Sequence, residues 1–172
     1  MNLQKYIQTI PDFPQKGVNF KDITPLLENA KAYNYAIREL SKPFQNQEIQ
    51  KVVGIDARGF LLAAGVAYKL KAGISIVRKK GKLPRKTIQQ TYSLEYGQNI
   101  LEMHSDTIKR GEKVLIVDDV LATGGTLQAT INLVRKMRAK IMGLALLIEL
   151  RYLKGSRKIK GYKKNVLLEL DE

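Results

Sequence analysis

Short runs of Val, Ile and Leu recur along this chain, and three of them show no regular alternation of apolar and polar positions. These runs span residues 52–55, 74–77 and 114–117. Strands that are buried on both faces of a parallel sheet have this pattern. A fourth apolar run covers residues 142–150. We therefore predict at least four strands, of which the first three are covered on both faces.

Helical patterns lie between and after these runs. Residues 59–70 follow the first run and residues 126–137 follow the third, each with apolar residues at helical spacing. An earlier helix that carries Ala36, Ile37 and Leu40 precedes the first strand. Strands that alternate with helices predict an α/β fold whose central, mostly parallel sheet is flanked by helices.

Two segments depart from this alternation. Residues 10–17 are punctuated by Pro and Gly, which disfavours both a helix and a central strand. Residues 79–112 are longer than a crossover between two strands requires, and they contain two β-favouring stretches, 87–94 and 100–103. We predict an inserted hairpin here, and long insertions in compact domains are commonly lids or binding loops.

Composition narrows the classes of function. A length of 172 residues with 44% hydrophobic residues suits a single folded domain, residues 1–172. The chain has no cysteine and one histidine, His104, which excludes disulfide frameworks, thiolate metal sites and histidine-rich metal centres. We expect His104 to be a hairpin or surface residue.

Charge adds a further indication. The 30 basic and 16 acidic residues give a net charge of +14, which suggests an anionic partner: nucleic acid, a membrane surface or a phosphorylated small molecule. No apolar run approaches the roughly 20 residues that span a bilayer, and residues 1–10 lack the core of a signal peptide. We expect a cytoplasmic protein without membrane association.

The strongest motif follows the third apolar run. Residues 114–126 read Val-Leu-Ile-Val-Asp-Asp-Val-Leu-Ala-Thr-Gly-Gly-Thr, so that a buried strand leads to two acids and then to a Gly-Gly loop that opens a helix. Glycines let backbone N–H groups approach an anion, and the helix N-terminus adds partial positive charge. Adjacent carboxylates at this edge of the sheet can accept hydrogen bonds from two sugar hydroxyls. The pattern indicates a site for a ribose phosphate.

This motif resembles the 5-phosphoribosyl-1-pyrophosphate signature of type I phosphoribosyltransferases. The resemblance implies that Asp118 and Asp119 bind the ribose hydroxyls. It also implies that the following loop holds the 5′-phosphate, through Ala122, Thr123, Gly124, Gly125 and Thr126.

A second junction between strand and helix narrows the resemblance to the adenine phosphoribosyltransferases. Residues 53–60 are similar to the pyrophosphate-binding loop of that family, in which the peptide between the acid and the small residue can be cis. The similarity assigns Asp56, Ala57 and Arg58 to pyrophosphate, and a guanidinium can bind phosphate oxygens bidentately.

The basic stretch 78–86 resembles a family segment that contributes to the dimer interface and brings cations to pyrophosphate. It contains six Lys or Arg residues and no acid. On this basis we assign Arg78 and Lys82 to pyrophosphate, in the chain's own site or in that of a neighbouring subunit.

The predicted hairpin and the N-terminus complete the resemblance. Ser-Leu-Glu-Tyr-Gly at 93–97 is similar to the family's flexible catalytic loop, which implies that Glu95 handles a purine proton and that Tyr96 closes beside it. Residues 11–25 look like the family's purine-binding hood. By this resemblance, adenine would stack on Phe20, and the backbone N–H and C=O groups of Asn19 and Lys21 would form hydrogen bonds with its edge. The family usually has Arg after this Phe, and Lys21 retains the charge without the bidentate fork.

As a whole, the resemblance implies a type I phosphoribosyltransferase fold with three additions: a hood at 1–25, a flexible hairpin lid at about 87–103 and a basic C-terminal tail at 151–172. It implies transfer of phosphoribose to N9 of adenine, giving AMP and pyrophosphate, by a homodimer. Mg²⁺ would be held mainly by substrate oxygens and water, without direct protein ligands. We expect the basic residues of 151–164 to form a solvated surface.

Other classes of function stay open on the sequence alone. The chain could use another base, sense the donor without catalysis, or bind RNA. The hood and the Leu-Glu-Tyr-Gly loop argue against another base, and non-enzymatic regulators tend to carry an additional DNA-binding domain. Nucleic-acid binding is disfavoured because the tail lacks interleaved aromatic residues and a helix-turn-helix pattern. Receiver domains place their acidic pair after the first strand, whereas here the pair follows the third.

Overall fold

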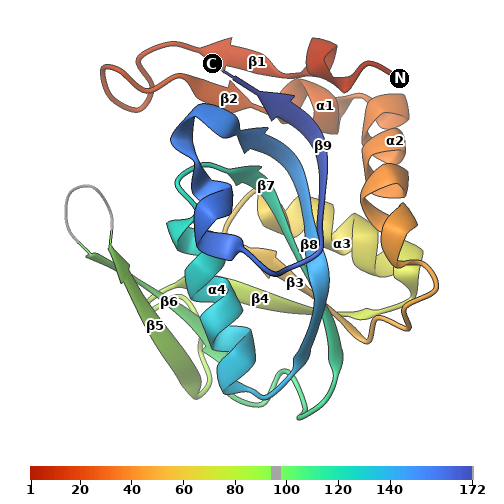
Figure 1. The fold of residues 1–172 in the computed structure, drawn as a ribbon, viewed down its shortest axis with the longest axis vertical. Coiled ribbons are helices and arrows are strands. Elements are labelled where there is room, and N and C mark those ends of the chain that lie inside the picture. Colours follow the sequence, from red (N-terminus) through yellow and green to blue (C-terminus); the bar gives the residue numbers. More distant parts are fainter. Residues whose placement is uncertain (94–97, 172) are drawn as a thin grey trace.

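The computed structural model describes residues 1–93 and 98–171. They form a seven-stranded sheet with helices on both faces and a separate two-stranded ribbon (Figure 1). The order in the sheet is β5-β6-β4-β3-β7-β8-β9. These strands are β3 (Lys51–Ile55), β4 (Gly73–Lys79), β5 (Thr87–Ser93), β6 (Gln98–His104), β7 (Lys113–Leu121), β8 (Lys140–Leu150) and β9 (Lys164–Leu170). The helices are α1 (Thr24–Glu28), α2 (Ala30–Ser41), α3 (Gly59–Leu70) and α4 (Gly125–Lys136), with 3-10 turns η1 (Leu3–Tyr6), η2 (Lys42–Phe44), η3 (Arg151–Leu153) and η4 (Gly155–Ile159).

Two of the three strands that the sequence predicts to be buried on both faces, β3 and β7, are buried in this way. The prediction is wrong for β4, where burial alternates and Ile74 is 43% exposed. In β3, Val52 packs into the core beneath α2 and α3, whereas its neighbour Val53 belongs to the core beneath α4. In β7, Leu115 and Ile116 divide between the two cores in the same way. Figure 1 shows α3 and α4 on opposite sides of the sheet. The expected α/β architecture is confirmed.

The predicted hairpin is confirmed for its described residues. β5 and β6 pair antiparallel from Thr87↔His104 to Ser93↔Gln98, and β6 pairs antiparallel with β4. The hairpin therefore extends one edge of a sheet that is otherwise parallel, and His104 ends its second strand. Residues 94–97, which include the predicted Glu95 and Tyr96, lie outside the described residues.

One boundary differs from the prediction in a way that matters for the site. β7 does not end before the acidic pair. It continues to Leu121, and Val120 pairs with Ile148 on β8. Because β7 pairs with β8 at Asp118 and again at Val120, the two acids lie within a paired strand rather than in a loop.

The basic residues of 151–164 are exposed, as predicted, but the predicted C-terminal tail 151–172 does not end as a free tail. Residues 164–170 form β9, which pairs parallel with β8. The Asn165 side-chain amide donates to the carbonyl of Glu39 at 2.9 Å and so joins β9 to α2. The apolar run Val166–Leu168 is short and has charged residues on both sides, Lys163 and Lys164 before it and Glu169 after it, so composition alone does not mark this edge strand.

The N-terminal ribbon lies across the end of the sheet toward which β7 and β8 point (Figure 1). β1 (Gln8–Ile10) and β2 (Phe20–Asp22) pair antiparallel, and turns join them. The Lys21 ammonium group lies 3.1 Å from Thr9 Oγ1 and so links the two strands. None of the described helices is long and apolar enough to span a bilayer.

Candidate functional site

A cleft of about 1060 Å³ lies between the N-terminal ribbon and the carboxyl ends of β3, β7 and β8. These three strands are neighbours in the sheet, so the residues that follow them meet at one edge. Open α/β sheets bind ligands at this edge. The lining residues come from four parts of the chain: Gln15–Lys21 apart from Lys16, the β3 end at Ile55, Asp56 and Arg58, the β7 segment at Asp118–Val120, Ala122, Thr123 and Thr126, and the β8 end at Leu150, Tyr152, Leu153 and Lys158.

Most of the predicted site residues line this one cleft. They are Asn19, Phe20, Lys21, Asp56, Arg58, Asp118, Asp119, Ala122, Thr123 and Thr126. Ala57, Gly124 and Gly125 lie in the same two loops but do not line the cleft. Arg78 and Lys82 also lie outside its lining. The structure thus brings together residues from distant parts of the sequence.

The loop after β7 has the geometry that an anion site needs. Gly124 adopts a φ of +78°, a left-handed conformation that disfavours other residues, and α4 begins at the next residue. The N–H groups of the first helical turn therefore open toward the loop. The Tyr92 hydroxyl of β5 lies 3.4 Å from Thr126 Oγ1, which places the hairpin beside this loop.

The two acids of β7 are both buried, with 8% of Asp118 and 7% of Asp119 exposed. Asp118 Oδ1 accepts the Asp119 backbone N–H at 2.9 Å. Burial, together with the adjacent Asp119 charge, raises the pKa of Asp118 well above its ordinary value. Gly59 packs against this carboxylate, and a larger residue would not fit, because a Cβ there would lie 2.6 Å from Asp118 Oδ1.

Arg58 connects the acidic pair to the N-terminal ribbon. Its Nε lies 2.6 Å from Asp119 Oδ2, and its Nη1 donates to the Lys21 carbonyl at 2.9 Å. Its guanidinium also lies over the Phe20 ring, 4.5 Å from the centroid. The contact with Asp119 lacks hydrogen-bond geometry, so Oδ2 is a buried acceptor without a donor among the described residues. A hydroxyl in the cleft could supply that donor.

The peptide between Asp56 and Ala57 is cis, as the family resemblance implies. The Asp56 carboxylate accepts from Arg78 Nε at 3.3 Å, and Arg78 Nη1 donates to the Lys82 carbonyl at 3.1 Å. Contacts therefore join the predicted pyrophosphate residues that follow β3 to Arg78 and Lys82. Of these residues, only Asp56 and Arg58 line the cleft.

The segment after β8 is the part of the site that sequence reasoning missed. Tyr152, Leu153 and Lys158 line the cleft, although they belong to the predicted solvated tail. Gly155 touches the phosphate loop so closely that a Cβ there would lie 2.1 Å from the Ala122 carbonyl oxygen. The signal was available, since residues that follow a strand next to β7 reach the same edge of a parallel sheet.

A polar cluster around the buried Glu149 holds this C-terminal segment in place. Glu149, at the end of β8, accepts hydrogen bonds from the Ser156 hydroxyl and the Lys164 ammonium group. The same two donors lie 2.6 Å from each other. Burial raises the pKa of Glu149, but the hydrogen bonds from Lys164 and Ser156 outweigh burial, so the net shift is downward. Glu149 is therefore an ionised anchor for η4.

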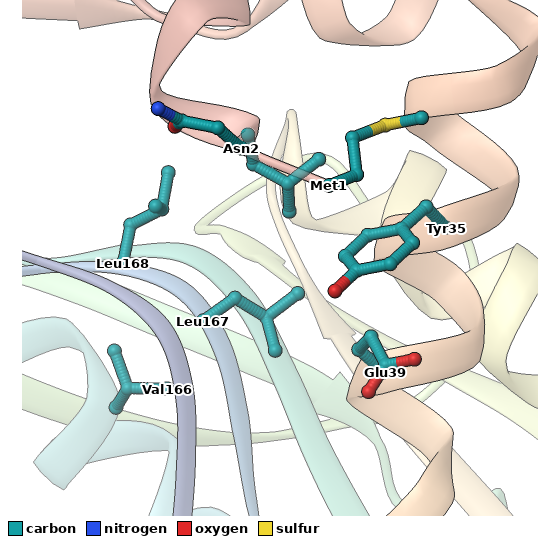
Figure 2. A pocket seen from close by; sticks show the side chains of 8 residues that line it. Met1, Asn2, Tyr35, Glu39, Val166, Leu167 and Leu168 are labelled. Carbon is teal, nitrogen blue, oxygen red and sulfur yellow. The ribbon is translucent and has the colours of Figure 1, made fainter.

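A second, smaller cavity of about 260 Å³ lies away from this cleft (Figure 2). Its walls come from the N-terminus, α2 and β9, through Met1, Asn2, Leu3, Tyr35, Glu39 and Val166–Leu168. Two of its polar side chains are already engaged, because Asn2 caps η1 and Glu39 pairs with Arg38. No predicted site residue lines it, and the larger cleft is the candidate site.

Comparison with known proteins agrees with this site. The phosphoribosyl transferase domain family matches residues 20–170. An adenine phosphoribosyltransferase of Brachyspira hyodysenteriae is 50% identical over 169 residues, which cover 98% of this chain and 99% of that protein.

Two solved structures give the same result for the fold. Adenine phosphoribosyltransferase from Rhodothermus marinus superposes with a TM-score of 0.95 at 49% identity, over 98% of this chain and 96% of that chain. The Saccharomyces cerevisiae enzyme, complexed with an imino-altritol bisphosphate and adenine, superposes with a TM-score of 0.90 at 34% identity, over 96% of both chains. With the acidic pair, the phosphate loop and the hood in one cleft, this chain belongs to the phosphoribosyltransferase family, in its adenine phosphoribosyltransferase branch.

Proposed function

We propose that this protein transfers the 5-phosphoribosyl group of 5-phosphoribosyl 1-pyrophosphate to N9 of adenine, giving AMP and pyrophosphate. One observation carries the proposal: a ribose-phosphate loop and an aromatic hood share a single cleft. The adenine bound to the yeast relative supports the choice of base.

Different residues of the cleft would bind the phosphate, the ribose and the base. The 5′-phosphate would lie at the start of α4, where the N–H groups of residues 124–126 and two threonine hydroxyls can donate. The ribose hydroxyls would donate to Asp118 and Asp119, and Asp119 Oδ2, which pairs with Arg58 but accepts no hydrogen bond of good geometry, can accept one of them. The adenine ring would stack near Phe20, within the hood.

The reaction exchanges one bond at the ribose for another. The bond between C1 and the pyrophosphate oxygen breaks, and its electron pair leaves with pyrophosphate. N9 of adenine forms the new bond to C1 and loses its proton. Positive charge develops on the ribose after the first bond weakens and before the second is complete. The acidic pair lies close to this charge, and its carboxylates are already in position, so they need no reorganisation during the reaction. The resemblance assigns the purine proton to Glu95, which remains a prediction.

Mg²⁺ fits this cleft as an ion that the donor carries. Among residues 1–93 and 98–171, no group of three or more His, Asp or Glu side chains could hold a metal alone. An ion held through pyrophosphate and ribose oxygens needs no such group, and the oxygen-rich wall at Asp118 and Asp119 suits a hard cation. When bound, Mg²⁺ would neutralise part of the departing pyrophosphate charge.

We further propose a cytoplasmic homodimer whose hairpin closes over the bound substrates. Tyr92, close to Thr126, places the described part of the hairpin beside the phosphate loop. Closure would exclude the water that could hydrolyse the donor.

The activity test compares bases in the presence of one donor. The protein is incubated with 5-phosphoribosyl 1-pyrophosphate, Mg²⁺ and adenine, hypoxanthine or guanine in turn, and the nucleotides are separated by chromatography. AMP should form rapidly, with the other nucleotides at least a hundredfold slower, because a site that reads one base edge leaves its polar groups unpaired with another. A faster reaction with hypoxanthine or guanine would reject the proposed base, and no consumption of donor would reject the reaction.

Replacing Arg58 by Lys should weaken the binding of both substrates. A lysine cannot reach Asp119 and the Lys21 carbonyl together while lying over Phe20, so the KM for adenine and the KM for the donor should each rise about tenfold. Arg38→Lys is the matched control. Arg38 also pairs with an acid, Glu39, and lies over an aromatic ring, Tyr35, but its side chain lies on the exposed face of α2, away from the cleft. Steady-state kinetics that show wild-type values for both substrates in Arg58→Lys would contradict this bridging role.

A further inference from the structure

Glu102 of β6 is a buried carboxylate that the reaction does not use directly. Only 3% of the residue is exposed. Its Oε1 accepts the backbone N–H groups of Lys82 and Leu83, both at 3.1 Å. Its Oε2 accepts from Thr87 Oγ1 at 3.3 Å and from Gln89 Nε2 at 3.5 Å. One side chain thus joins the basic loop after β4 to the base of the hairpin.

Lys82 is held from two sides. Its N–H donates to Glu102, and its carbonyl accepts from Arg78, whose Nε in turn contacts Asp56 at 3.3 Å. The contacts therefore run without a gap from the cleft wall at Asp56, through Arg78 and the Lys82 backbone, to the hairpin. A shift of the loop would break this chain of contacts at Lys82.

The charge of the loop explains why a carboxylate suits this position. Residues 78–86 contain six basic residues and no acid, so the loop repels itself. A buried carboxylate is costly unless it is fully hydrogen-bonded, and Glu102 has donors on both oxygens. An amide at this position would present a donor to at least one of the groups that now donate to it.

We infer that Glu102 is a positioning residue for the pyrophosphate end of the donor. By holding the Lys82 and Leu83 backbone it fixes the loop that carries the cations, and it keeps that loop in register with Asp56. This role rests on the proposed function, since it concerns binding of the same donor.

The test replaces Glu102 by Gln and measures both substrates and the loop itself. The KM for the phosphoribosyl donor should rise about tenfold, because hydrogen bonds to a charged acceptor are lost. The KM for adenine and kcat should stay within about twofold, since the inference places no adenine contact on this loop. In the ligand-free protein, hydrogen exchange at the Lys82 and Leu83 amides, followed by NMR, should become faster.

Glu112→Gln is the matched control. Glu112 is also a carboxylate that accepts a backbone N–H, that of Lys109 at 2.8 Å, but it lies in an exposed turn. Its variant should keep the wild-type KM for both substrates. If Glu102→Gln does not fold, Glu102→Asp retains the charge but retracts it by one methylene, and the same KM difference and faster exchange are expected.

The outcomes separate this inference from the proposed function. If the wild-type protein makes no AMP, the function fails, and amide exchange still tests the hold on the loop. If the wild type makes AMP, the inference is overturned by an unchanged donor KM, by equal increases for both substrates, or by amides that stay protected.

Discussion

Gly155→Ala is expected to lower kcat/KM for the donor about a hundredfold, because displacement of a binding group by about 1 Å costs that much. A Cβ at this position would lie 2.1 Å from the Ala122 carbonyl oxygen and 2.9 Å from the Gly124 backbone nitrogen. Both atoms belong to the backbone of the phosphate loop, which cannot move aside as the end of a flexible side chain can. Either the loop or η4 must shift, and both line the cleft.

The comparison variant is Gly73→Ala. The atoms nearest to a Cβ there belong to the Lys51 side chain, with Nζ at 3.1 Å, and this flexible side chain can move away. Steady-state kinetics and the melting temperature of both variants should be measured together. Gly155→Ala should lose activity with most of its stability intact, whereas Gly73→Ala should match the wild type. Wild-type kcat/KM in Gly155→Ala would show that this contact does not set the loop geometry.

Asp118→Asn combined with Asp119→Asn should lower kcat/KM for the donor roughly a thousandfold. Each carboxylate offers a charged acceptor to a ribose hydroxyl, and such hydrogen bonds contribute about 1.5–3 kcal/mol each. A calorimetric titration with the donor should show that donor binding is lost in parallel with turnover. The Arg38→Lys protein serves as the control, since its substitution is distant from the cleft. Unchanged donor binding would remove the ribose assignment of both acids.

The single variant Asp118→Asn should at the same time stabilise the ligand-free protein. The folded state raises the pKa of Asp118, so it binds a proton more readily than the unfolded chain, and stability is lost as pH rises above the ordinary value of 3.8. At neutral pH the folded protein therefore carries the cost of a buried charge that Asn removes. Each kcal/mol recovered should raise the melting temperature by about 2–4 °C.

Thermal melts of wild type and Asp118→Asn between pH 5 and pH 8, without substrates, test this expectation. The advantage of the variant should be largest at pH 8 and should shrink toward pH 5. An advantage that grows toward low pH would have the wrong sign for a raised carboxyl pKa.

The predictions from sequence succeed where the site is contiguous in the chain. Residues 114–126 supply a strand, two acids, a phosphate loop and a helix start in one segment, so a single motif determines their relative positions. The junction at Asp56 and Arg58 is predictable for the same reason. The partners of Arg58 are not predictable from the sequence, because its contacts with Asp119 and Lys21 depend on how distant segments of the chain pack together.

The C-terminal wall of the cleft shows the opposite case. Leu153 and Lys158 lie in a segment whose composition is that of a solvated surface, and nothing local marks them as lining residues. Their place follows from the pairing of β8 with β7 and from the close contact of Gly155 with the phosphate loop. These are tertiary facts, since each joins segments that periodicity and composition treat as independent.

The division of the cleft between hood residues 17–21 and the segment 150–158 has a consequence for the synthesis of this protein. A polypeptide emerges from the ribosome N-terminus first. The hood, β3 and β7 are therefore available for folding while the segment that touches the phosphate loop is still unmade. A nascent chain that stops before residue 150 has the acids and the glycines but lacks the wall against which Gly124 packs. The complete cleft therefore forms only in chains whose translation has passed η4.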